Sequence, residues 1–169
     1  MKVQDVKDSF YSGLRNAIAL ANPARTVVLR GVTRPGVLVV ENEFPVSDGG
    51  PVEAFQLIWS GLKRTADGLL AVTCEISYTV NGSTGATETA SSTLGRGRAL
   101  GAMDAELVSA LSGSTRSFAG SSFAESAGVV VQSASGTQVF WGDITFGPVV
   151  ISGDRVGRSA AVEVFGYGQ

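Results

Sequence analysis

The sequence predicts an α+β fold, a single domain over residues 1–169 in which two amphipathic helices pack on a mainly antiparallel β-sheet. Three observations predict it. Apolar residues recur with helical spacing at the start of the chain and again near residue 105. Elsewhere, β-branched and aromatic residues alternate with polar ones, as they do in half-buried strands. The length of 169 residues is typical of one folding unit.

The first predicted helix covers residues 3–21. Its charged side chains, such as Lys7 and Arg15, fall on one side, and it should end at Asn22-Pro23 because proline restricts the residue before it. The other side is apolar, since the spacings of three and four residues place these side chains on one face: Val3, Val6, Phe10, Leu14, Ala17, Ile18 and Ala21.

Strands are predicted next. Residues 26–30 and 36–41 are two β-branched runs, and the turn-rich connection 31–35 suggests that they pair as a hairpin. Residues 53–80 predict one long antiparallel hairpin, with its turn at residues 65–68.

A second helix is expected over about residues 98–111, with Gly113 just past its end, where a C-cap belongs. The segments on either side, at about 81–97 and 112–136, are rich in Gly, Ser, Thr and Ala. Such composition is typical of long flexible loops, and part of the second segment is expected to order against a partner.

Two strands close the chain, over residues 137–146 and 158–167, with a turn at Gly153-Asp154 between them. Asp143 follows Gly142 inside the first of these strands, where it is expected to mark a bulge.

Composition argues against several classes of function. The net charge is −2 and the pI about 5.1, and no basic run stands out, so sequence-specific nucleic-acid binding is not expected. No segment has the length of apolar sequence that a membrane span needs, and the N-terminus lacks the apolar run of a signal peptide. We therefore expect synthesis in a cytoplasm and no membrane partner. The single cysteine, Cys74, is expected to be a small buried residue on a strand.

The residues also give no catalytic, cofactor-binding or metal site. The chain has no histidine, which removes the commonest general base and zinc ligand. Asp104 and Glu106 lie two apart on the predicted helix and project in different directions, so they cannot share a site. We expect no cofactor and no enzyme activity; the open alternative is an enzyme that assembles distant carboxylates such as Asp143.

Aromatic and basic residues are the candidates for contacts between subunits. Large aromatic residues concentrate on the long hairpin and the last strands, where they form either sheet core or an interface. The turn at residues 30–35 and the two low-complexity segments are further candidates. The candidate interface residues are Arg30, Arg34, Trp59, Arg96, Arg98, Phe118, Phe123 and Trp141.

The order of these elements resembles that of phage tail-terminator proteins, the type represented by the minor tail protein U of lambdoid phages. The matching segments are residues 6–21, 26–41, 55–80, 100–111 and 160–167. The resemblance implies a homo-oligomeric ring, commonly hexameric, that stops tail-tube polymerisation and joins the tail to the head connector. It also implies the tail-tube protein and the neck protein as partners, and a location in the tail or neck of the virion.

Two other readings stay open. One is another part of the same machine, such as a tail-tube, neck or head-completion protein. The second, from a different class, is a small-ligand or peptide-binding module, which would be a stable monomer with an apolar pocket.

Overall fold

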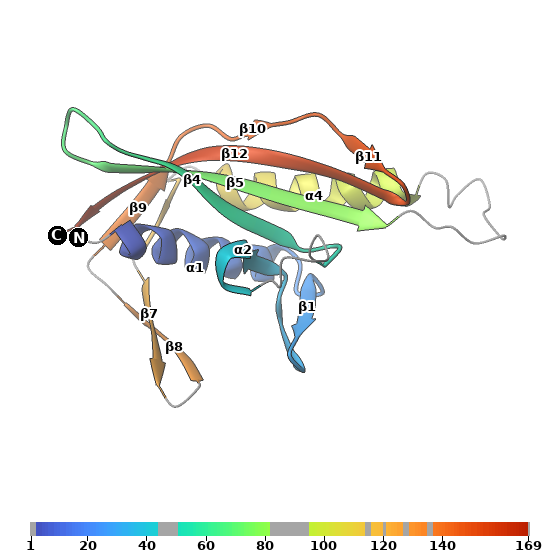
Figure 1. Cartoon of the computed structure of the whole chain (residues 1–169), viewed down its shortest axis with the longest axis horizontal. Helices are drawn as coiled ribbons and strands as arrows, with labels where there is room; N and C mark the ends of the chain where they lie inside the picture. The colour runs from blue at the N-terminus through green and yellow to red at the C-terminus, as the bar shows by residue number, and fades with distance from the viewer. Residues whose placement is uncertain are drawn as a thin grey trace.

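The computed structural model describes residues 3–43, 51–81, 95–113, 116–119, 121–126, 129–134 and 137–168. It confirms the predicted α+β fold, with two long helices and mainly antiparallel strands (Figure 1). In chain order the elements are α1 (Val3–Ala21), β1 (Thr26–Leu29), β2 (Val32–Pro35), β3 (Val37–Val39), α2 (Val40–Glu43), β4 (Phe55–Arg64), β5 (Leu70–Asn81), α4 (Gly95–Leu111), β6 (Ser117–Phe118), β7 (Ser121–Ser126), β8 (Val129–Ala134), β9 (Thr137–Trp141), β10 (Thr145–Phe146), β11 (Val150–Ser152) and β12 (Arg155–Gly168).

One eight-stranded sheet forms the body of the molecule. Its main path runs in the order β3-β4-β5-β12-β9-β6, and β10 and β11 also pair with β12. The central pair is β5 with β12, which stay in one unbroken register from Asn81–Arg155 to Leu70–Gly166. The pairing of β3 with β4 is parallel, and the other pairings in this sheet are antiparallel.

Helices α1 and α4 lie side by side and cover the same face of the sheet. Alternate residues of β5, among them Cys74 and Tyr78, point into this layer and are fully buried. Each helix buries one apolar stripe. The buried residues are Val6, Phe10, Leu14 and Ile18 in α1, and Leu100, Met103, Leu107 and Leu111 in α4. Ala21, which the sequence predicts on the first stripe, is exposed, and so is Val108 beside the second stripe.

The opposite face of the sheet is mixed. In β5 it carries Thr73, Glu75, Ser77 and Thr79, which alternate with the buried residues. The aromatic rings of Phe140 and Phe165 stack on it, and near β3 it buries Leu38 and Ala54 against Val27 of β1. Neither α1 nor α4 covers this face.

The long hairpin of β4 and β5 is confirmed, but the hairpin predicted for residues 26–41 is wrong in its pairing. β1 pairs with β2, and β3 joins the main sheet beside β4. Arg30 and Gly31 have φ of 50° and 80°, so they form a two-residue turn of the type that suits a tight hairpin. The turn is therefore shorter than the predicted connection of residues 31–35.

The two predicted loops also differ from the structure. Helix α4 begins at Gly95, so residues 95–97 are helical, and residues 82–94 lie outside the described residues. The segment 112–136 contains strands β6, β7 and β8, and β7 and β8 pair as a hairpin. The many Ser and Ala residues hide the strand signal there, although the run Val129–Val131 is β-branched and favours a strand.

The predicted strand over residues 137–146 is divided. β9 ends at Trp141 and β10 begins at Thr145, and β11 follows after a second break. All three pieces pair with the same side of β12. Asp143 lies in the first break, where its carboxylate forms an ion pair with Arg116. The turn at Gly153-Asp154 is confirmed, with Gly153 at a φ of 58°.

Candidate subunit interface

Three aromatic residues that the sequence suggests for the interface lie instead inside the subunit. Trp59, Phe118 and Trp141 surround Phe10 of α1, with ring centroids 5.6–5.9 Å from its ring. Trp141 is 5% exposed, and its indole N–H donates a 2.8 Å hydrogen bond to the carbonyl of Leu111 at the end of α4. The assignment of Trp141 to an interface is therefore wrong, and the half-buried Trp59 and Phe118 also serve the core.

The basic candidates are spread over two places. Arg30 is exposed at the turn between β1 and β2, and Arg34 in β2 donates a 3.1 Å hydrogen bond to the hydroxyl of Tyr11 in α1. Arg96 and Arg98 lie in the first turn of α4, half-buried and exposed respectively. Phe123 lies in β7, where its backbone is paired with Gln132. The four arginines thus lie in two pairs, Arg30 and Arg34 in the hairpin of β1 and β2, and Arg96 and Arg98 at the start of α4.

The hairpin of β1 and β2, residues 26–35, is an arm. It forms a separate two-stranded sheet at the lower border of the molecule in Figure 1. Val28 and Val32 are 63% and 61% exposed on it. An isolated two-stranded hairpin is marginally stable in water, so the arm depends on contacts at its root.

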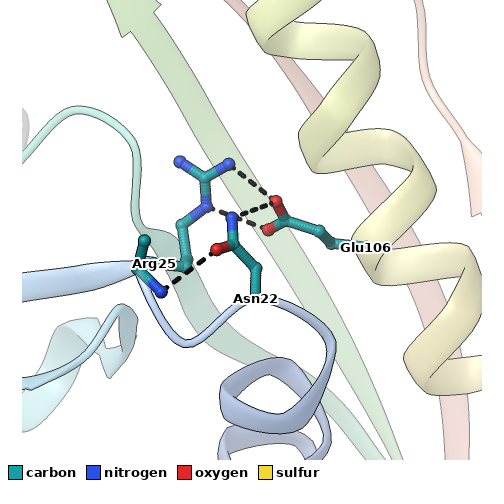
Figure 2. A network of polar contacts seen from close by, with 4 residues as sticks. Asn22, Arg25 and Glu106 are labelled. Carbon is teal, nitrogen blue, oxygen red and sulfur yellow. Dashed lines mark hydrogen bonds and ion pairs between the residues drawn. The ribbon is translucent and has the colours of Figure 1, made fainter.

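A polar network at the root of the arm supplies those contacts (Figure 2). Arg25 donates from Nε to Oε2 of Glu106 at 2.9 Å and from Nη2 to Oε1 at 2.8 Å. Asn22, just beyond α1, donates to the same Oε1 at 2.7 Å and accepts from the backbone N–H of Ala24. The network ties the end of α1 and the start of the arm to α4.

The hydrogen bonds of this network favour the charged forms of Arg25 and Glu106. Burial raises the pKa of Glu106, but the hydrogen bonds from Arg25 and Asn22 outweigh burial and lower that pKa below its ordinary value. The hydrogen bond to Glu106 raises the pKa of Arg25. Both side chains are about one-tenth exposed, so this ion pair is screened much less than a surface pair.

At the upper border of the molecule in Figure 1, β10 and β11 form the other side of the sheet. Each pairs with β12 on one side, and the described residues provide no strand on the other. Val149, Val150 and Ile151, which we call the β11 edge, are 44%, 59% and 66% exposed. An open strand edge with exposed apolar residues is a surface that readily accepts another chain.

The border formed by β4 is open over only part of its length. β3 pairs with Phe55, Gln56 and Leu57, and no described strand pairs with the rest of that side of β4. Ile58 is 38% exposed and Leu62 is 59% exposed. The two borders of the sheet are therefore different surfaces, one made of β4, β3 and the arm, the other of β10 and β11.

The two helix carboxylates belong to different networks, as their spacing predicts. Asp104 accepts hydrogen bonds from the hydroxyl of Tyr78 and, at 2.9 Å, from Arg158, whereas Glu106 faces Arg25. Burial, and then the hydrogen bond to Asp104, raise the pKa of Tyr78. Among the described residues, no three acidic or cysteine side chains gather as a metal site would require.

A groove of about 350 Å³ lies between α1 and β6. It is open to solvent, and among the described residues of its lining Asn16 has the one polar side chain, so these residues do not supply the converging polar groups that orient a small ligand. No helix in the described part of the chain is long and apolar enough to cross a membrane. The groove is lined by Gly13, Asn16, Ala17, Leu20, Phe118 and Ala119.

A comparison with known protein families finds none that matches this chain. A comparison with curated proteins finds no relative. Its function must therefore be inferred from the chain's own geometry and chemistry.

Proposed function

We propose that this chain is a structural subunit of a phage or phage-like tail. In this proposal, copies assemble head to tail into a ring that ends the tail tube and joins it to the head connector. No catalytic step is part of this role. The partners are further copies of the chain, the tail-tube protein and the neck protein.

The observation that carries the proposal is the difference between the two borders of the sheet. A ring needs a heterologous interface, in which one surface of a subunit contacts a different surface of the next. Here one border carries β4, β3 and the arm, the other carries β10 and β11, and both expose apolar residues. Two unlike, apolar borders support head-to-tail contact better than they support a two-fold dimer.

Strand direction also supports this contact. From β4 through β5 and β12 to the series β9, β10 and β11, neighbouring strands alternate in direction. Near the level of β10 and β11 the β4 border is formed by β3, which is parallel to β4, so a next copy placed with this border beside β10 and β11 again runs antiparallel to them. The sheet can therefore continue from copy to copy without a change in pairing type.

The two faces of the sheet fit a ring as well. With both helices on one face, a sheet that curves around an axis can place the helices outside and the opposite face inside. The middle of that face carries carboxylates such as Glu75 and Glu163, which suit a water-filled channel. This arrangement accounts for a sheet face that α1 and α4 leave open.

The solution mass of the purified chain, measured by light scattering over a wide range of concentration, tests the proposal. A discrete closed oligomer, with rings in electron micrographs, is the expected result. Open-ended polymers of stacked rings would favour a tube subunit instead. A monomer over the whole range would contradict head-to-tail assembly.

Two matched variants connect the oligomer to the borders. Leu62→Lys and Ile151→Lys each place a charge on one border, and either one should prevent assembly, because charged edges resist pairing. Val108→Lys is the control, since Val108 is 40% exposed on α4, away from both borders. Normal rings from both border variants would exclude these borders as the interface.

A further inference from the structure

The arm and the β11 edge lie at the same level along the sheet, although they belong to opposite borders. On one side, Thr79 of β5 is paired with Gly157 of β12, which in turn is paired with Val150. On the other side, the carbonyl of Thr79 accepts from the N–H of Glu53. Phe55, two residues on, donates to the carbonyl of Gly36 at the root of the arm.

In Figure 1 the arm lies at the lower border, just right of the middle of the molecule, and β11 lies at the upper border, farther to the right. If copies stand side by side in the same orientation, the arm of one copy comes level with β11 of the next. A head-to-tail interface requires this placement of two different surfaces.

The two surfaces also match in chemistry. Val32 is paired with Leu29 and so lies on the face of the arm that packs on the subunit, whereas Val28 is the exposed apolar residue of the outer face. Val28, Val150 and Ile151 are each more than half exposed. Arg30 at the tip of the arm is exposed, and so is Asp154 in the turn beside β11. Apolar surface thus faces apolar surface, with opposite charges at the margins.

The arm is held in one orientation before any partner binds. Arg25 and Glu106 fix its first strand at the root, and Arg34 in its second strand is bonded to Tyr11. A pre-ordered arm loses less conformational freedom on association than a loose one. Val28, on the face of the arm that turns away from the subunit, is therefore available to a partner.

We propose that the arm of one copy packs across the β11 edge of the next copy, with Val28 against Val149, Val150 and Ile151. This contact rests on the head-to-tail assembly proposed above and names the surfaces that join. The partner is a second copy of this chain. The arm is thus the element that links neighbouring subunits at this end of the sheet.

Cysteine cross-linking between separately purified variants tests the contact. Val28→Cys and Ile151→Cys chains are mixed, allowed to assemble, oxidised mildly and then blocked with a maleimide before denaturation. Native Cys74 is fully buried and does not interfere. A disulfide-linked dimer is expected at about tenfold or higher yield in the mixture than in either variant alone. A Val108→Cys chain mixed with Ile151→Cys is the control.

The light-scattering mass of the same samples separates the two proposals. Rings without the cross-link would overturn the arm contact and leave the ring proposal intact. Cross-linked dimers without rings would support the contact and contradict the ring. If neither rings nor cross-links form, both proposals are overturned.

A second variant keeps the test independent of oxidation. Val28→Thr keeps a β-branched side chain on the outer face of the arm but removes its apolar contact. It should raise the concentration needed for assembly by about tenfold or more, since about 1.4 kcal/mol corresponds to each factor of ten. Unchanged assembly of this well-folded variant would also overturn the arm contact.

Discussion

Arg25 and Glu106 are joined by two parallel hydrogen bonds across 81 positions of the sequence, between the root of the arm and the middle of α4. Bidentate pairing of this kind fixes direction as well as distance. The pair thus connects the stability of the helical layer to the orientation of the arm, and the first prediction follows from this connection.

Replacing Glu106 by Gln should lower the free energy of unfolding at pH 7 by about 1–3 kcal/mol, because Arg25 loses its charged acceptor while nearly buried. The pKa of Glu106 is lowered in the folded state, so its contribution is present above the ordinary glutamate pKa. That contribution is lost as the pH falls through the lowered value. Urea unfolding from pH 7 down to pH 3 should show the two proteins converging at the acid end. A constant difference at every pH would contradict this.

Replacing Gly13 of α1 and Gly101 of α4 by alanine should change the free energy of unfolding in opposite directions. A Cβ at Gly13 would lie 2.1 Å from Cγ of Phe118, so Gly13→Ala should destabilise the fold by about 1–3 kcal/mol. Gly101 has no neighbour within 4 Å of that position, and Gly101→Ala should stabilise the fold by about 0.5–1 kcal/mol. Thermal unfolding measures both. In a Phe118→Ala background the cost of Gly13→Ala should shrink, and an unchanged cost would argue against this contact.

Tyr78 should give the fold a sensitivity to alkaline pH. Its pKa is raised by burial, so folding is favoured below the ordinary tyrosine pKa, and this contribution is lost as the pH rises above it. Tyr78→Phe should lower the free energy of unfolding by about 1 kcal/mol at pH 7. Between pH 9 and about pH 11 the free energy of unfolding of this variant should fall less steeply than that of the native protein. Absorbance titration of the folded protein checks the cause, because Tyr78 should not ionise until the protein unfolds. If all three tyrosines of the chain ionise before the protein unfolds, buried Tyr78 is not the cause of the alkaline sensitivity.

Trp141 should contribute more to stability than Trp59. Trp141→Phe removes the buried bond from the indole to the carbonyl of Leu111 and should cost about 1–3 kcal/mol. Trp59 is half-buried, and Trp59→Phe should cost less than half as much. Denaturant midpoints followed by circular dichroism compare the two. Equal losses would mean that the bond to Leu111 adds little to stability.

The periodic elements could be predicted from the sequence, and the pairing of short strands could not. Spacings of three and four in α1, and alternation in β4 and β5, are signals within a single element. The partner of β1 depends instead on the backbone of Arg30, a residue that rarely adopts positive φ. The breaks in the strand after Trp141 likewise depend on how three short pieces fit against β12.

The candidate site was predictable only in part. Arg30 and Arg34 could be placed on a turn, and they lie in the arm. Trp141 could not be assigned to core or interface from the sequence, because an aromatic residue on a strand suits both. Val28, Val32 and the β11 edge give no signal of exposure, since β-branched runs usually mark buried strands. Only the three-dimensional arrangement shows that no other part of the described chain covers them.

Cys74 lies at the centre of β5 under both helices, and burial raises the pKa of its thiol. It is the only cysteine in the sequence. Because the thiolate is the reactive form, a thiol reagent can label this position only when the helical layer separates from the sheet. The labelling rate of Cys74 in the native chain therefore reports how often the core opens, and it can be compared between the free subunit and the assembled state.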